Sequence, residues 1–145
     1  MPKVETSVTI RAPIEKIFDT IVDPELTTQW SSGVSEVTNI KGNPWEKGSS
    51  IDMSYHVLGM KFTQHMVTSE IGKPRKVIYL MEGGFPGTFE FALDPQGQVT
   101  KVDIRLDYSV PGGIVGKIAN QVLLERMNQK NIESSADGLK IFCEV

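Results

Sequence analysis

The chain has 145 residues, of which 39% are hydrophobic and 23% are charged, and its formal net charge is −3. This length fits a single domain over 1–145 that can bury a core without disulfides. The small negative charge argues against nucleic acid as a partner. One cysteine excludes an internal disulfide, and no apolar run is long enough for membrane insertion. The N-terminus lacks the apolar stretch of a signal peptide, so we expect a cytoplasmic protein.

The first residues predict a strand followed by two short helices. Residues 3–11 alternate between apolar and polar side chains, which is typical of a half-buried strand. Pro13 suits the first turn of a helix, and apolar residues then recur at helical spacing from 14 to 22. The sequence Asp23-Pro24-Glu25 predicts the start of a second, shorter helix that carries Trp30.

Two runs in the middle of the chain determine each other's register. Residues 51–57 and 60–66 both alternate, and a two-residue turn at 58–59 pairs them face for face, with Tyr55 opposite Phe62. In this register His56 and His65 point outward, and His65 lies opposite Asp52. The two histidines do not converge, so we expect surface residues rather than a metal or acid–base site.

For the next strand, the sequence pattern does not determine which face is inward. The strand 76–82 is apolar on both faces, and the pattern leaves open which face is inward. Its second face, with its partner strand, carries an apolar set that could be an oligomer surface: Val67, Ile71, Ile78 and Leu80. Residues 83–87 read as either the flexible rim of a pocket or a bulged corner.

The strands 88–93 and 102–110 are predicted to pair around a loop at 95–98. With Asp94 opposite Val99, Phe91 meets Val102 and Phe89 meets Ile104. The charged residues between them fall on the opposite, solvated face, where cross-strand ion pairs are expected: Glu90, Asp103, Arg105 and Asp107.

The last third predicts one long amphipathic helix from Gly113 to about Cys143. Its main stripe recurs every three or four residues: Val115, Ile118, Val122, Glu125, Gln129, Ile132, Ala136, Leu139 and Cys143. Two members, Glu125 and Gln129, are polar and would be costly in a dry core. Either they border a wet cavity, or the helix turns them to the surface.

The element order is therefore β-α-α-β-β-β-β-β-β-α. Strands joined by short turns give an antiparallel sheet, and helices segregated to one side give the α+β class. We expect a curved sheet of six or seven strands wrapped around the C-terminal helix, with two short helices after the first strand.

This order and several landmarks resemble the helix-grip superfamily, which is also called Bet v 1-like, START-like or SRPBCC. The likeness is strongest to its polyketide cyclase/dehydrase and lipid-transport group. The matching landmarks are Ile10–Phe18, Val22-Asp23-Pro24 with Trp30, Val67–Glu70 leading into Lys73–Val77, and Pro111-Gly112-Gly113. The resemblance implies a helix-grip fold with a deep cavity for an apolar or amphipathic ligand. It transfers no catalytic residue set, metal site or cofactor.

The predicted cavity lies between the sheet and the last helix. Its expected lining is Met53, Tyr55, Phe62, Gln64, Met66, Tyr79, Met81, Phe89, Phe91, Ile104, Leu106, Tyr108, Ile118, Val122, Glu125 and Gln129. The favoured function is binding or transport of a lipid, sterol, quinone or polyketide-like molecule by a monomer or homodimer. The alternatives are a cyclase or dehydratase using Glu125 or a tyrosine as acid or base, and an accessory protein acting through its outer sheet face.

Overall fold

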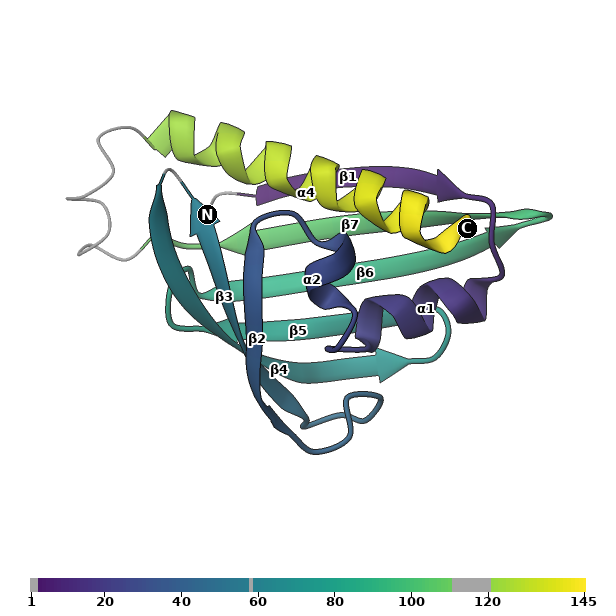
Figure 1. Ribbon diagram of the computed structural model, residues 1–145, viewed down its shortest axis with the longest axis horizontal. Helices are drawn as coiled ribbons and strands as arrows, with labels where there is room; N and C mark the ends of the chain where they lie inside the picture. Colours follow the sequence, from purple (N-terminus) through teal and green to yellow (C-terminus); the bar gives the residue numbers. More distant parts are fainter. Residues whose placement is uncertain (1–2, 58, 111–120) are drawn as a thin grey trace.

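The computed structural model describes residues 3–57, 59–110 and 121–145. Within them, seven strands form one antiparallel sheet in the order β1-β7-β6-β5-β4-β3-β2. The sheet is curved, and the helices lie on its concave side (Figure 1). The predicted α+β class, the helix-grip arrangement and the order of elements are confirmed.

Most elements lie where the sequence pattern predicts them. Their bounds are β1 Lys3–Ile10, α1 Ile14–Val22, α2 Thr27–Trp30, β2 Val34–Lys41, β3 Ser50–Val57, β4 Met60–Gly72, β5 Lys76–Glu82, β6 Gly87–Gln96, β7 Val99–Tyr108 and α4 Gln121–Cys143. The short helix α2 begins at Thr27 rather than at Pro24. The Asp23 carboxylate instead accepts a hydrogen bond from the Glu25 amide (3.0 Å), which closes a turn before the helix. Residues 113–120, predicted as helix, lie outside the described residues.

The predicted hairpin between β3 and β4 is confirmed. Tyr55 pairs with Phe62, Met53 with Gln64, and Asp52 with His65. A β-bulge at Thr68/Glu70 then changes the faces of β4. As a result Ile71 packs inward against the core, and the prediction that it shares a face with Val67 is wrong.

The structure also resolves the orientation of β5. Val77 and Met81 are buried, whereas Leu80 is 42% exposed on the convex face. The predicted register between β6 and β7 is wrong by two residues, because Phe91 pairs with Ile104 and Gln96 with Val99. The turn is shorter than predicted, and a shift of two residues keeps every side chain on its face.

Helix α4 packs along the edge strand β1 (Figure 1). The Gln129 amide donates to the Glu5 carbonyl (2.8 Å), and the Lys140 ammonium donates to the Thr9 carbonyl (2.9 Å). These side chains satisfy backbone carbonyls on an edge that no further strand covers. Gln129 therefore lies at the strand edge, and its predicted place in a cavity is wrong.

The buried stripe of α4 differs from the prediction in its N-terminal half. It consists of Leu124, Asn128, Ile132, Ser135, Ala136, Leu139 and Cys143. The prediction is correct from Ile132 onward. Val122 is 59% exposed and Glu125 is also exposed. The second of the two readings of Glu125, that the helix turns it to the surface, is therefore the correct one.

The C-terminal half of α4 approaches α2 closely at a glycine. A Cβ atom at Gly138 would overlap the backbone carbonyl of Trp30. The Trp30 indole N–H also donates to the Thr20 carbonyl (3.2 Å), so α1, α2 and α4 are joined at this point. The contact determines how deeply α4 lies in the sheet.

The loop 83–86 between β5 and β6 is held by one glutamine of β4. Gln64 is 2% exposed, and its amide N–H groups contact the carbonyls of Gly83 (2.8 Å) and Phe85 (3.2 Å). Its carbonyl accepts the Phe85 amide (3.0 Å). Gly84 has φ +45°, and a Cβ there would lie 2.7 Å from the Gln64 oxygen. The loop is thus a fixed corner that carries the Phe85 ring into the interior.

We predict that Gly138→Ala destabilises the protein, although alanine normally stabilises a helix interior by about 1 kcal/mol relative to glycine. The added methyl group forces α4 away from Trp30, and we expect a loss of roughly 1–3 kcal/mol in the free energy of unfolding. Urea denaturation followed by circular dichroism measures this change. The exposed Ser134→Ala on the same helix should stay within about 0.5 kcal/mol of wild type. A stabilised Gly138→Ala would contradict the contact.

A second prediction concerns Gln64→Leu, which keeps a similar volume but removes the amide. The carbonyl of Gly83 and the amide of Phe85 lose their partner, so we expect a loss of about 2–4 kcal/mol. The exposed Gln98→Leu in the β6–β7 turn is the control and should be near neutral. Equal stability of the two variants in urea denaturation would show that the loop does not depend on Gln64.

Candidate functional site

Two adjoining cavities lie between the sheet and the helices. The α4-side cavity, about 70 Å³, is lined by Ser31, Ser32, Val34, Met53, Tyr55, Gln64, Met81, Phe85, Phe89, Leu106, Tyr108, Asn128, Asn131, Ile132 and Ser135. The α1-side cavity, about 50 Å³, is lined by Ile21, Val22, Thr27, Trp30, Ser31, Pro44, Ser49, Ser50, Ile51, Met53, Met66, Thr68, Tyr79, Phe89 and Phe91. Ser31, Met53 and Phe89 belong to both and separate them.

One wall of the α4-side cavity is polar. Tyr108 comes from the end of β7, and Asn128, Asn131 and Ser135 come from successive turns of α4. We call these four residues the polar end. Ser135 accepts a hydrogen bond from the Ser32 amide (2.8 Å), which joins α4 to the chain after α2. The opposite wall is apolar and aromatic.

The Tyr108 hydroxyl is the unusual group of the polar end. Tyr108 is 1% exposed, and its hydroxyl oxygen is buried without a hydrogen bond of normal geometry to any described residue. Burial raises the pKa of Tyr108; the nearby Asn128 amide lowers it, and the Glu125 charge raises it. Asn128 is thus close to the hydroxyl but does not satisfy it. The phenol stays protonated and can donate.

Two other polar groups at this cavity already have partners. The Tyr55 hydroxyl donates to the Gln64 carbonyl (3.3 Å), and the Gln64 amide holds loop 83–86. The Phe85 ring lies 4.8 Å from the ring of Phe62 and 5.8 Å from that of Tyr108, measured between centroids. Gln64 and Tyr55 therefore shape the cavity rather than offering free hydrogen bonds.

The α1-side cavity is closed by the loop before β3. The Trp45 indole N–H donates to the Asp19 carboxylate (2.8 Å), and Lys73 pairs with the same carboxylate (3.1 Å). The Ser49 hydroxyl donates to the Thr68 hydroxyl (3.0 Å) inside the cavity wall. These contacts anchor the loop through Trp45 and leave the wall mainly apolar.

Most of the predicted lining residues lie at these cavities. They are Met53, Tyr55, Gln64, Met66, Tyr79, Met81, Phe89, Phe91, Leu106 and Tyr108. Phe62 and Ile104 pack nearby but line neither cavity, and Ile118 lies outside the described residues. Val122, Glu125 and Gln129 face away from the cavity.

Sequence reasoning missed the helix side of the site. Asn128, Asn131 and Ser135 were not predicted because the stripe was drawn through Glu125 and Gln129. Leu124 is the apolar neighbour of Glu125, and drawing the stripe through it would have brought Asn128 inward. Phe85 was not among the predicted lining residues, although the segment 83–87 was read as a pocket rim or a bulged corner.

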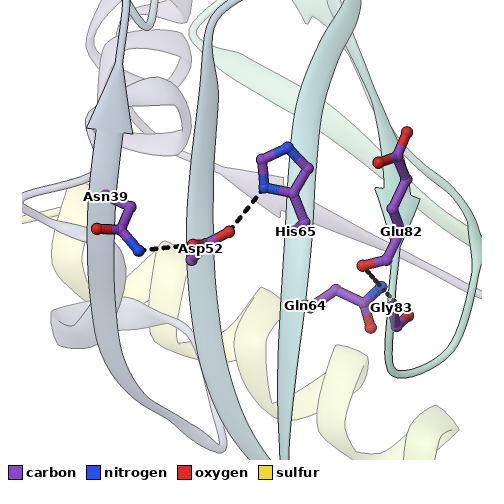
Figure 2. Close-up of polar contacts among 6 residues, drawn as sticks. All are labelled: Asn39, Asp52, Gln64, His65, Glu82 and Gly83. Carbon is purple, nitrogen blue, oxygen red and sulfur yellow. Dashed lines mark hydrogen bonds and ion pairs between the residues drawn. The ribbon is translucent and has the colours of Figure 1, made fainter.

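The convex face carries the histidines, as predicted. His65 Nδ1 lies 2.7 Å from the Asp52 carboxylate, which also accepts a hydrogen bond from Asn39 (2.8 Å) (Figure 2). The hydrogen bond from Asn39, followed by that from His65, lowers the pKa of Asp52. Gln64, the preceding residue, makes its contacts with Glu82 and Gly83 instead (Figure 2).

Two kinds of feature are absent from the part of the chain that the structure describes. No group of three or more histidine, cysteine, aspartate or glutamate side chains is placed there to hold a metal ion. None of the helices described is long and apolar enough to cross a bilayer.

Solved structures similar to this chain share its fold. TTHA0849 from Thermus thermophilus superposes with a TM-score of 0.83 at 20% identity, covering 97% of this chain and 95% of that one. A START superfamily protein from Mycobacterium smegmatis gives 0.76 at 17% identity, covering 98% and 97%. The major latex-like protein 151 from Panax ginseng gives 0.75 at 13% identity, covering 97% and 96%.

Comparison with curated proteins finds no match. The sequence profile described as polyketide cyclase/dehydrase and lipid transport, however, matches residues 1–142. This match covers nearly the whole chain and agrees with the fold of the START-like neighbours. The chain therefore belongs to the polyketide cyclase/dehydrase and lipid transport family.

Proposed function

We propose that this protein binds a small amphipathic molecule, of the lipid, sterol, quinone or polyketide-like kind, between the sheet and α4. The observation that carries the proposal is the Tyr108 hydroxyl, which is buried without a hydrogen-bond partner among the described residues, at the polar end of a mainly apolar cavity. Buried polar groups in folded proteins are nearly always hydrogen-bonded. A bound molecule with a polar atom would supply the missing partner.

The sizes of the two cavities suggest how such a molecule is held. At about 70 and 50 Å³, each is far below the roughly 300–1,000 Å³ of usual ligand sites. They meet at Met53 and Phe89, and methionine adapts readily to new shapes. The proposed ligand therefore places its polar group at Tyr108 and Asn128, and its apolar part extends past Met53 toward Trp30.

The enzyme alternative receives less support from the described lining. Its titratable residues are Tyr55, Tyr79 and Tyr108, and burial raises the pKa of all three. At neutral pH they are protonated, so they can donate a proton but cannot act as the base, and the described lining holds no other titratable residue for that role. Glu125, the other candidate acid or base, faces away from the cavity. These observations support binding over acid–base catalysis.

The outer-face alternative is also weakened. The bulge in β4 turns Ile71 inward, so the predicted apolar set loses one of its four members. Leu80 remains exposed and pairs with Val67, which is half-buried, as is Ile78. Native mass spectrometry of freshly purified protein tests the binding proposal directly, because a co-purified small molecule would appear as a fixed added mass.

We predict that Asn131→Trp blocks the α4-side cavity. Asn131 is partly exposed at the cavity wall, so a larger side chain can enter it without disturbing the core. The affinity for the uncharged dye N-phenylnaphthylamine, measured by fluorescence titration, should fall about tenfold or more, which is about 1.4 kcal/mol. Lys130→Trp, on the neighbouring exposed position, should leave dye binding unchanged. Equal binding by both variants would place the dye elsewhere.

A further prediction compares the Tyr→Phe substitution at two positions, where it should change the stability of the protein in opposite directions. Tyr108→Phe removes an unsatisfied hydroxyl, so the ligand-free protein should gain about 1 kcal/mol of stability. Tyr55→Phe removes a hydroxyl bonded to Gln64 and should lose about 1 kcal/mol. Displacement of the dye by decanol should become roughly three- to tenfold weaker in Tyr108→Phe, through loss of one hydrogen bond. Unchanged decanol affinity would contradict the proposed role of Tyr108.

A further inference from the structure

The polar end of the α4-side cavity is built from uncharged groups. Tyr108, Asn128 and Ser135 are each more than nine-tenths buried. Among the residues described as lining either cavity, none is a lysine, arginine, histidine, aspartate or glutamate. The hydrogen bonds available to a ligand are therefore those of a phenol, of amides and of the Ser135 hydroxyl, which accepts from the Ser32 amide and retains its own proton.

These groups both donate and accept. The Tyr108 phenol donates, and the Asn128 amide presents two N–H donors and one carbonyl acceptor. A hydroxyl group on a ligand could use both roles at once, and a ketone, ester or amide carbonyl could accept from the two donors. An ionised carboxylate accepts only and would leave the amide carbonyl facing like charge.

The surroundings of the polar end also disfavour an anion. A carboxylate that leaves water without a cation partner loses several kcal/mol of solvation. The Glu125 carboxylate is exposed on α4 three positions before Asn128, which makes the two residues neighbours on the helix, and its charge contributes to the raised pKa of Tyr108. Its negative charge opposes a second negative charge at the same end of the cavity.

We propose that the cavity selects amphiphiles with an uncharged head, such as an alcohol, ester or ketone, and discriminates against the carboxylate of the same chain length. This inference rests on the proposed function, because it names the class of molecule that the site takes. Tyr108 and Asn128 bind the head, and Glu125 strengthens the discrimination from outside the cavity.

The test uses three ligands with one chain length: decanol, methyl decanoate and decanoate. Each displaces N-phenylnaphthylamine from the wild-type protein at about pH 7.5, where the carboxyl group is ionised. We expect the two uncharged ligands to bind at least about tenfold more tightly than decanoate, because the buried charge has no partner. Decanoate binding equally or more tightly would overturn the inference and leave the proposed function standing.

Charge variants at Glu125 distinguish an electrostatic effect on ligand affinity from an effect of the shape of the cavity. Glu125 is exposed, so Glu125→Gln and Glu125→Lys should fold normally. Decanoate affinity should rise in the order wild type, Gln, Lys, by roughly three- to tenfold over the series, and the difference should shrink at high salt. Decanol affinity should stay constant. Glu133→Lys, exposed further along α4, is the matched control and should change neither ligand.

Two remaining outcomes are decisive. If decanoate affinity does not change across the Glu125 series, the assigned role of Glu125 is overturned. If none of the three ligands displaces the dye, and Asn131→Trp binds the dye like wild type, the proposed function and this inference both fall. Weak decanoate, tight decanol and a rising Glu125 series together support the inference.

Discussion

The architecture depends on how one helix is seated in a curved sheet. Gly138 lets the C-terminal half of α4 touch the Trp30 backbone, and Lys140 and Gln129 attach the helix to the edge carbonyls of β1. A single straight helix cannot fill a concave surface along its whole length. Around Leu139 the interior is a packed apolar core. One cavity remains along the middle of α4, and a second remains beside Trp30 below α1 and α2.

The helices and strands were predictable because the spacing of apolar residues distinguishes a helix from a strand and identifies the face that is buried. The register of the β3–β4 hairpin was predicted correctly, because only one short turn places the apolar residues of both strands on the same face and pairs Tyr55 with Phe62. The β6–β7 register did not, because a shift of two residues preserves every face. What decides between Phe91–Ile104 and Phe91–Val102 is the length of the turn before Val99, which begins after Gln96 and not after Asp94 as predicted.

The candidate site was predictable on the sheet and not on the helix. Inward residues of a strand follow from alternation, so Met53, Phe89 and Tyr108 could be named from sequence. On α4 the spacing alone allows neighbouring stripes, and Asn128 and Gln129 are equally polar. Tertiary contacts decide between them: Gln129 reaches the Glu5 carbonyl at the sheet edge, which turns Asn128 toward Tyr108. Such a contact joins residues 124 positions apart and leaves no local trace.

The buried polar side chains of the interior are of two kinds: those whose hydrogen bonds are completed by described residues, and those whose hydrogen bonds are not. Gln64 makes its hydrogen bonds within the protein: its amide N–H donates to the loop that carries Phe85, and its carbonyl accepts from the Phe85 amide and the Tyr55 hydroxyl. It is therefore part of the scaffold. Tyr108 lies on β7, with β6 and β5 between it and the β4 strand that carries Gln64, and no described side chain completes its hydrogen bond. Protein stability alone would favour phenylalanine there, because an unsatisfied buried hydroxyl is costly. Among the described residues the Tyr108 hydroxyl has no hydrogen-bond partner, and the proposed ligand would supply one.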